Sequence, residues 1–263
     1  MNCKRINLLG CLIDNLSLPE TIAEIDKIIF NRHLSQHVVI NADKLIKVRK
    51  NRQLREIVES CQIINVDGMP LVWASILLKT PLKERVAGID LMQNLLSHGQ
   101  EKGYSFYFLG AKETTIKKLI DKIKLTHPRI KISGFRNGFW ENEDEKNIVE
   151  SIKNSRPDIL FVGISSPKKE IFIKNNLNLL EVPFVMGVGG SFDVLAGLRK
   201  RAPLWVQKCG LEWCYRLSQE PSRLWKRYFI SNTFFLFLVV KQLLKTWSKK
   251  GSKKTLESSY RSV

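Results

Sequence analysis

The chain has 263 residues, of which 44% are hydrophobic and 26% charged, and its formal net charge is +18. This composition excludes an intrinsically disordered chain and suits one large domain with a small appendage. Residues 199–263 carry fifteen Lys and Arg against three Glu, so about +12 of the net charge lies in the last quarter. Such a concentration indicates an anionic partner, which is phosphate, nucleic acid or an acidic membrane surface. A basic tail that serves only solubility is the alternative.

Cysteines, histidines and the N-terminal residues point away from secretion and from a metal site. The five cysteines form no CxxC pair, which suits free thiols in a reducing compartment. The four histidines lack the spacing of metal ligands. The apolar stretch after Arg5 is interrupted by Asp14 and Asn15, so no signal peptide is predicted. Because no run reaches the roughly 20 apolar residues of a spanning helix, we expect a cytoplasmic protein.

Short apolar runs alternate with amphipathic segments through the first two-thirds of the chain. Strands are predicted at residues 6–9, 38–40, 63–66, 104–109, 130–133, 159–164 and 184–188. Helices are predicted at residues 19–31, 114–126 and 145–154, and Ser17 and Glu20 have capping-box spacing before the first of them. This alternation predicts an α/β fold with a doubly wound, mostly parallel, Rossmann-like sheet. Ligands of such sheets bind beyond the carboxyl ends of the strands.

The composition changes after Gly197, where Arg and Trp become common and the pattern turns helical up to about Trp247. We therefore predict an α/β core at residues 1–197, a helical, membrane-associating appendage at residues 198–247, and a polar, disordered tail at residues 248–263. Residues 234–240 form an apolar run that ends at Lys241 and is flanked by aromatic residues. Such a segment is predicted to lie at the bilayer interface.

Polar side chains follow two of the predicted strands. Asn41 follows residues 38–40, and Asp67 follows residues 63–66 on a turn that leads into a helix. A carboxylate at the carboxyl end of a strand can act as a general base or bind a sugar hydroxyl. Helix capping by Asp67 is the alternative. Arg85 either clamps a phosphate or pairs with the neighbouring Glu84 or Asp90.

Two further turns after strands suit an anionic or nucleotide ligand. Residues 165–170 combine small hydroxyl side chains with two lysines, including Lys169, at a predicted helix start. In the next turn, Gly187, Gly189 and Gly190 would let a nucleotide approach the backbone, and Asp193 could accept a hydrogen bond from a base or ribose. A glycine-rich turn is equally common without a ligand, and neither a Walker loop nor a GxGxxG fingerprint is present.

The sequence contains no Asp-x-Asp pair, which would be the usual holder of a metal on a sugar diphosphate. If the protein transfers sugars, other groups must neutralise the leaving diphosphate. Candidates are Arg216, Arg223, Lys226 and Arg227, because guanidinium groups bind phosphate oxygens in pairs. Alternatively these residues form a solvated or lipid-facing basic stripe.

Seven motifs, in order along nearly the whole folded chain, resemble those of the WecG/TagA/CpsF glycosyltransferases. They are VDGMP at 66–70, ERVAGID at 84–90, SPKKE at 166–170, GVGGSFD at 187–193, RAPLW at 201–205, GLEWCYRL at 210–217 and EPSR at 220–223. The resemblance implies an inverting, metal-independent transfer of a hexosamine-type sugar from a UDP-sugar donor to a polyprenyl-diphosphate-linked acceptor of the GlcNAc type. The product would enter a cell-surface polysaccharide or teichoic acid.

The resemblance also implies roles for individual residues. Asp67 matches the presumed base, and Asn41 and Arg85 match the other active-site positions. The positions expected to bind the donor are Phe139, Lys169, Gly187, Gly189, Gly190, Asp193, Arg216, Arg223 and Lys226. We expect no cofactor and no nucleic acid partner. The protein is expected at the inner face of the cell membrane as a peripheral protein, with an appendage that completes the active site. A homo-oligomer is compatible with these expectations.

The chain departs from the family pattern at several positions. Val39 stands where threonine is frequent, Lys169 where glutamine is, Phe139 where tyrosine is, and Ser165 where glycine is. Val39 removes a hydroxyl and Lys169 adds a charge, so the sequence leaves the donor open. The rival interpretation is a non-enzymatic, basic nucleic-acid-binding or membrane-adaptor protein on an α/β core. That interpretation explains the charge but not the polar turns after three strands.

Overall fold

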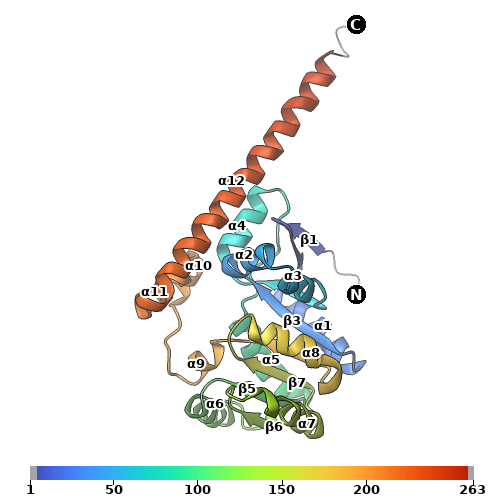
Figure 1. The fold of residues 1–263 in the computed structure, drawn as a ribbon, viewed down its shortest axis with the longest axis vertical. Coiled ribbons are helices and arrows are strands. Elements are labelled where there is room, and N and C mark those ends of the chain that lie inside the picture. The colour runs from blue at the N-terminus through green and yellow to red at the C-terminus, as the bar shows by residue number, and fades with distance from the viewer. Residues whose placement is uncertain (1–4, 260–263) are drawn as a thin grey trace.

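The computed structural model describes residues 5–259, with side chains through Trp247 except that of Asn142. Its centre is a six-stranded sheet in the order β4-β3-β8-β7-β5-β6, in which every pairing is parallel. The strands are β3 (Ser35–Ile40), β4 (Ile63–Val66), β5 (Ser105–Gly110), β6 (Lys131–Arg136), β7 (Ile159–Gly163) and β8 (Phe184–Gly187). The predicted doubly wound α/β fold is confirmed (Figure 1).

The first predicted strand lies outside this sheet. β1 (Arg5–Leu8) pairs antiparallel with β2 (Cys11–Asp14), a strand that the sequence pattern did not predict. Leu9 and Gly10 make the two-residue turn, with φ of 53° and 86°, which is the backbone of a tight hairpin. Asp14 attaches the hairpin to the sheet edge, because its carboxylate accepts a hydrogen bond of 2.7 Å from the Ile64 amide.

Helices follow the strands on both faces of the sheet. They are α1 (Leu18–Phe30), α2 (Ala42–Lys50), α3 (Arg52–Glu59), α4 (Met69–Leu77), α5 (Gly88–Lys102), α6 (Glu113–Thr126), α7 (Glu145–Ser155), α8 (Lys168–Leu180) and α9 (Ser191–Leu195), with the 3₁₀ helix η1 (Asn142–Asp144). The capping box of α1 is confirmed: the Ser17 amide donates to Glu20 Oε2 at 2.8 Å, and the Glu20 amide donates to Ser17 Oγ at 3.3 Å.

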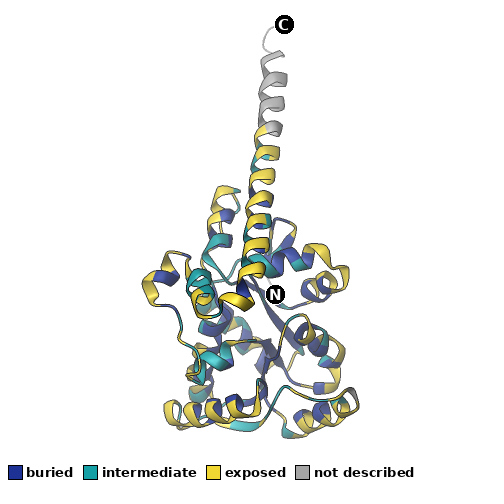
Figure 2. Cartoon of the chain, turned by 60° about the vertical axis from the view of Figure 1, so that its left-hand side comes forward, coloured by how far each residue is buried: buried dark blue, intermediate teal, exposed yellow. Residues whose placement is uncertain are grey.

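Strand residues alternate between two apolar layers. Ile159 and Phe161 of β7 belong to a cluster shared with α1, α5 and α6, whereas Leu160 and Val162 belong to a cluster shared with α7 and α8. Strands buried on both faces appear in the sequence as continuous apolar runs. For this reason the predicted strand ends lie within one or two residues of the observed ends at most positions. The exceptions are the start of β3 and the end of β6, which each extend three residues further than predicted. Figure 2 shows the buried strands between helices whose outer faces are exposed.

The C-terminal part consists of α10 (Leu204–Lys208), α11 (Glu212–Gln219) and the long α12 (Pro221–Ser259), which runs past α4 and projects beyond the core (Figure 1). The prediction that the helical pattern ends near Trp247 is wrong, because α12 continues to Ser259. After Pro221 the helix contains no proline and only one glycine, Gly251, so its composition holds no strong helix breaker. The division into three units stays a prediction.

The core of the protein is not confined to the residues before Gly197. Phe235, Leu238 and Val239 of α12 are 4%, 8% and 6% exposed and join an apolar cluster with residues of the hairpin, α2, α3 and α4. The run at residues 234–240 therefore does not lie wholly at a bilayer interface. One side of it packs on the protein, while Leu236, Phe237 and Val240 face outward.

We predicted from run lengths that no segment could span a membrane. By length and composition, however, Pro221–Trp247 of α12 could do so, because an 18-residue window within it has a mean hydropathy of 1.2. Polar residues such as Ser231 and Lys241 interrupt each apolar run in the sequence, so counting uninterrupted runs misses the segment. The mean hydropathy of the window still reaches 1.2.

Candidate active site

The polar residues predicted from the sequence meet at one edge of the sheet. β3 leads to its neighbour β4 at one end of the sheet, and the chain then crosses to β5 and β6 at the other end. Asn41 follows β3, Asp67 follows β4, Lys169 is the second residue of the helix after β7, and Gly189 follows β8. Because parallel strands bring their carboxyl ends to one edge, and ligands bind where the winding reverses, this edge is the candidate site.

Asp67 is held on a turn that continues the sheet. Its amide donates to the Ile40 carbonyl at 2.8 Å, and the next residue, Gly68, has a φ of 126° that an L side chain rarely adopts. Burial raises the pKa of the Asp67 carboxyl, and the negative charge of Glu212 raises it further. Arg216 and Arg85 oppose both effects. The alternative reading of Asp67 as the cap of α4 is not what the structure has, because the cap position is Gly68.

Arg85 lies beside Asp67 because the Val86 amide donates to the Val66 carbonyl at 2.9 Å. Its guanidinium contacts acceptors from three helices: Asp90 of α5 at 3.2 Å, Gln207 of α10 at 3.2 Å and Glu212 of α11 at 3.0 Å. Of the two pairings considered from the sequence, the one with Asp90 is present. Glu84 instead accepts a hydrogen bond from the Leu18 amide. Arg85 therefore connects the core to the appendage.

Two more arginines complete this network. Arg201 donates to both oxygens of Asp90, at 2.6 and 2.8 Å. Arg216 donates to Glu212 Oε1 at 3.1 Å. The sequence reasoning missed Arg201, Gln207 and Glu212 as parts of the site. Arg201 and Glu212 lie in the motifs RAPLW and GLEWCYRL, so the signal was present, but no spacing rule joins residue 85 to residue 212.

Asn41 has a structural role in addition to any chemical one. Its side-chain oxygen accepts a hydrogen bond of 2.9 Å from the Lys44 amide and thereby caps α2. Because this hydrogen bond holds the side-chain oxygen, it also fixes the orientation of the side-chain amide nitrogen. The position at the end of β3 agrees with the sequence prediction, and the part that Asn41 plays in catalysis stays a prediction.

Lys169 is a buried cation beneath the glycine turn. It is 8% exposed, and its ammonium lies 3.8 Å from Glu170 Oε1, whereas Lys44 Nζ lies 2.6 Å from the same oxygen. Glu170 is thus paired mainly with Lys44. Burial lowers the pKa of Lys169 to about 8, and the charge of Lys44 acts in the same direction. A cation held this way, without a close partner, suits an anionic ligand.

The glycine turn lies directly over Lys169. A Cβ at Gly187 would come within 3.0 Å of the Lys169 side chain, and one at Gly189, whose φ is 54°, would come within 3.3 Å of its Nζ. Gly190 has open space around its Cα, as a turn that admits a ligand requires. Asp193 lies one turn into α9 and is 3.8 Å from Arg199 Nε. Phe139 follows β6 and is 67% exposed.

Arg223 and Lys226 are not among the strongest influences on the Asp67 pKa, which come from Glu212, Arg216, Arg85 and Asp90. Arg223 pairs with Glu220 at the start of α12, and Lys226 Nζ lies 5.5 Å from the centre of the Trp225 ring. The structure thus brings Asp67, Arg85 and Arg216 together and leaves Arg223 and Lys226 on the first turns of α12. Their contact with a diphosphate stays a prediction.

Chemically, this edge combines a carboxylate whose pKa is raised with arginines supplied from two parts of the chain. Such a carboxylate can take a proton from a hydroxyl group, and guanidinium groups can stabilise a departing phosphate. Among the described residues, no three His, Cys, Asp or Glu side chains are grouped to hold a metal ion.

Comparison with known proteins identifies the family. The model described as "Glycosyl transferase WecG/TagA/CpsF family" matches residues 6–249. An N-acetylglucosaminyldiphosphoundecaprenol N-acetyl-beta-D-mannosaminyltransferase of Bacillus subtilis (strain 168) is 36% identical over 188 residues, which cover 72% of each chain. The protein of the same name from Staphylococcus aureus (strain MW2) is 31% identical over 228 residues, which cover 86% of this chain and 87% of the relative. The chain therefore belongs to the WecG/TagA/CpsF family of glycosyltransferases.

Proposed function

We propose that the protein transfers a hexosamine-type sugar, such as N-acetylmannosamine, from a UDP-sugar to GlcNAc linked to a polyprenyl diphosphate. The observation that carries the proposal is the meeting of Asp67 with Arg85 and Arg216 at the carboxyl edge of the sheet. The names of the relatives support the choice of sugar and acceptor. The product is a linkage unit for a cell-surface polymer.

The reaction is a single displacement. Asp67 takes the proton of the acceptor hydroxyl as its oxygen attacks the anomeric carbon, and UDP leaves from the opposite face with inversion. Arg216 of the appendage stabilises the charge that develops on the diphosphate, while Lys169 and the turn at Gly187–Gly190 hold the donor. Asn41 and Phe139 lie at the same edge and contact the sugars.

A donor screen tests the proposal directly. UDP release is measured with a polyprenyl-diphosphate-GlcNAc analogue and a panel of UDP-sugars, and the glycosylated acceptor is identified by mass spectrometry. We expect release with at least one UDP-hexosamine and only when acceptor is present. Binding of nucleic acid that weakens steeply with salt, without UDP release from any donor, would favour the rival basic adaptor.

Metal independence is expected because the chain lacks an Asp-x-Asp pair and offers arginines for the diphosphate. Turnover should stay within about twofold in excess EDTA, since the charge on the leaving group is neutralised by protein cations. The measurement is the UDP-release rate with and without EDTA. A loss of activity that Mg²⁺ or Mn²⁺ restores would contradict this mechanism for the leaving group.

The outer side of α12 supports docking on a membrane surface. Its exposed apolar stripe consists of Trp225, Phe229, Ile230, Leu236, Phe237, Val240, Leu244 and Trp247, each at least 51% exposed. A helix with one face packed on the protein and an apolar face toward solvent has the character of an interfacial helix. We propose that this stripe enters the headgroup region, so that the protein is peripheral and its site faces the lipid-linked acceptor.

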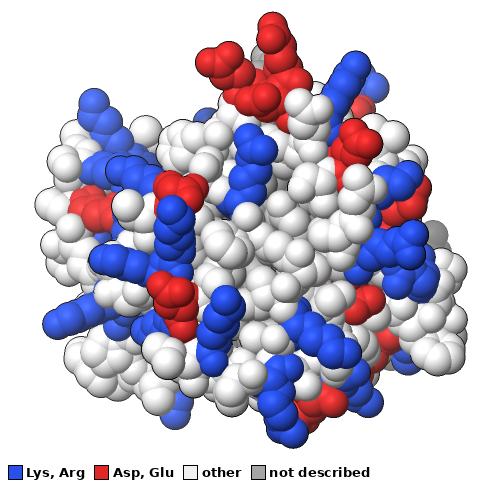
Figure 3. Space-filling view, turned by 90° about the horizontal axis from the view of Figure 1, so that it is seen from below, with Lys and Arg blue, Asp and Glu red and all other residues white. Residues whose placement is uncertain are grey.

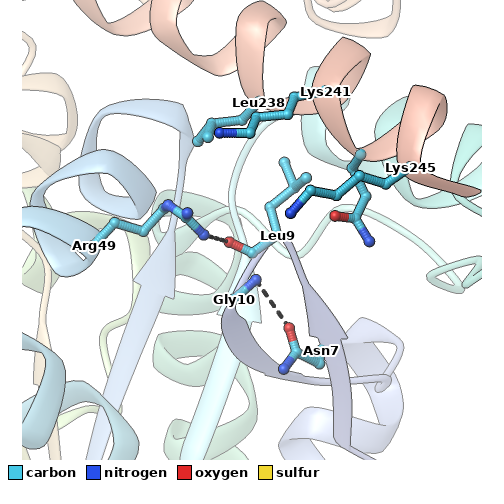
Figure 4. A pocket seen from close by; sticks show the side chains of 8 residues that line it. Asn7, Leu9, Gly10, Arg49, Leu238, Lys241 and Lys245 are labelled. Atoms are coloured by element: carbon cyan, nitrogen blue, oxygen red, sulfur yellow. Dashed lines mark hydrogen bonds between the residues drawn. The ribbon is translucent and has the colours of Figure 1, made fainter.

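A cationic cavity beside the stripe fits the same role. It has a volume of about 420 Å³ and lies between the hairpin turn and α12 (Figure 4). Arg49, Lys241 and Lys245 line it, and none of the lining residues that the structure describes is acidic. Arg49 is oriented by its hydrogen bond to the Leu9 carbonyl, drawn in Figure 4. Basic side chains beside an apolar stripe that enters the headgroup region would meet the phosphates of anionic lipids. Each would contribute about 1 kcal/mol to the free energy of membrane binding.

Replacing Leu236, Phe237 and Val240 together by serine should weaken binding to vesicles that contain phosphatidylglycerol by at least about tenfold. Each of these side chains is more than half exposed in the free protein, and fully burying such a side chain is worth about 1.5–3 kcal/mol. The melting temperature should stay near that of the unchanged protein, because the stripe makes little of the core. Flotation with vesicles and thermal unfolding are the two measurements.

Phe235→Ser is the matched control, since Phe235 is on the same helix but only 4% exposed. It should lower the melting temperature, because removing a buried aromatic side chain typically costs about 3–5 kcal/mol. Unchanged flotation of the triple serine variant would remove the stripe from membrane binding.

The surface opposite to α12 does not favour the nucleic acid interpretation. Figure 3 shows Lys and Arg interspersed with Asp and Glu around a largely uncharged centre on this face. Nucleic acid binding is driven by basic residues gathered on one face. The excess positive charge lies instead in the appendage, which carries the proposed membrane contact.

A further inference from the structure

One carboxylate joins the two arginines that flank Asp67. Glu212 begins α11 and is 17% exposed at its side chain. Its Oε2 accepts from Arg85 Nη1 at 3.0 Å, and its Oε1 accepts from Arg216 Nη2 at 3.1 Å. Arg85 belongs to the core, and Arg216 lies one turn further along α11. Glu212 is therefore the point at which the two basic groups of the site are attached to each other.

A carboxylate is needed here because several arginines with the same charge lie close together. Arg85, Arg201 and Arg216 approach one another in a partly buried region, where like charges repel strongly. Asp90 separates Arg85 from Arg201, and Glu212 separates Arg85 from Arg216. With each guanidinium held by a carboxylate, its orientation is defined before any ligand binds. Preorganised groups of this kind need no rearrangement as charge develops.

Glu212 also contributes to the ionisation of Asp67. The charged groups that face Asp67 include Glu212 and Arg216 of α11, Arg85 before α5, Asp90 of α5 and Arg201 before α10. Lys169 of α8 is close enough for Asp67 to act on it. After burial, the negative charge of Glu212 is the largest influence that raises the Asp67 pKa. A higher pKa makes the carboxylate a stronger acceptor for a proton.

We infer that Glu212 is a positioning residue, whose carboxylate bridges Arg85 of the core to Arg216 of the appendage and sets the charge around Asp67. This inference rests on the proposed function, in which Asp67 is the base. In the proposed reaction Glu212 touches neither the sugar nor the diphosphate, because its two oxygens accept from Arg85 and Arg216. Its effect reaches the reaction through the two arginines and through the basicity of Asp67.

Three substitutions of Glu212 separate these effects. Glu212→Ala should lower kcat about 10²-fold, since displacement of groups that align a reaction by about 1 Å has this magnitude. Glu212→Asp should restore part of the loss, because the charge returns at a shorter reach. Glu212→Gln keeps the size and one acceptor but removes the charge. It should move the acid limb of the pH profile of kcat/KM to lower pH, because Asp67 then loses its proton more readily.

Glu220→Gln is the control. Glu220 pairs with Arg199 and Arg223 in the same part of the chain, but it is not among the strongest influences on the Asp67 pKa. This variant should leave the acid limb where it is. A residue that merely holds the appendage in place would change kcat without moving the limb.

A measurement without substrate keeps the inference testable if transfer is not observed. The Asp67 carboxyl carbon is followed by ¹³C NMR through a pH titration in the unchanged protein, in Glu212→Gln and in Glu220→Gln. We expect the midpoint to fall only in Glu212→Gln. An unchanged midpoint and an unchanged acid limb would overturn the inference. Absence of UDP release from every donor, with a lowered midpoint, would overturn the proposed function alone.

Discussion

Replacing Asp67 by asparagine is expected to lower turnover by roughly 10²–10⁴, the usual contribution of a general base, while the fold and the affinity for UDP stay unchanged. Asparagine has the same shape, and the turn is held by the Asp67 amide and by Gly68, neither of which the substitution alters. The missing group is the one that takes the proton from the acceptor hydroxyl. The measurements are the UDP-release rate, thermal unfolding and UDP titration.

The pH dependence of activity gives a second test of Asp67 as the base. Burial and Glu212 raise the pKa of Asp67, and a base works only in its deprotonated form. Activity of the unchanged protein should therefore fall as the pH drops through this raised pKa, at a higher pH than for an ordinary aspartate. In Asp67→Asn the residual rate should lack this acid limb.

Asp121→Asn is the matched control, because Asp121 is an exposed carboxylate on α6, a helix that carries none of the site residues. It should leave both the rate and the pH profile unchanged. If Asp67→Asn kept a turnover within a factor of a few of the unchanged protein, Asp67 would not be the base.

Arg216→Ala is expected to lower kcat by about 10²–10³, the magnitude found when one group that stabilises developing charge is removed. Arg216 of the appendage lowers the pKa of Asp67 through its positive charge, and it is held by Glu212 at 3.1 Å. The melting temperature should change little, because exposed ion pairs contribute about 0–1 kcal/mol. The readouts are UDP release on a water-soluble acceptor and vesicle flotation, which should be unchanged.

Arg216→Lys and Lys208→Ala serve as comparisons. Lysine keeps the charge but cannot form paired hydrogen bonds with phosphate oxygens, so it should restore only part of the rate. Lys208 is an exposed cation at the end of α10 in the same region, and its loss should have little effect. A full rate for Arg216→Ala on the soluble acceptor would assign the appendage to anchoring alone.

Point substitutions are needed here, because removal of the whole appendage would also damage the core. We predicted from the sequence that the α/β core consists of residues 1–197. Phe235, Leu238 and Val239, however, pack with the hairpin and with α2, α3 and α4. A chain that ends at Gly197 would expose this cluster, so a loss of activity could not be assigned to missing arginines.

By itself the sequence determined the parallel α/β sheet and the edge at which the site lies. Strands buried on both faces appear as continuous apolar runs, and the turns after β4 and β8 carry Asp67 and the glycines in a contiguous pattern. The seven motifs determined the family. These features are local, so neighbouring residues are enough to recognise them.

Only the tertiary structure decided how distant segments meet. Ile6 and its neighbours were predicted as a sheet strand but form a hairpin, because the tight turn at Leu9 and Gly10 returns the chain at once. One side of α12 packs on the core and the other is exposed, a division that a nearly continuous apolar run does not encode. The contact between Arg85 and Glu212 spans 127 positions of the chain. Charge pairs at such separations depend on how the helices pack, because the energy of an ion pair depends on distance and burial in space, not on sequence spacing.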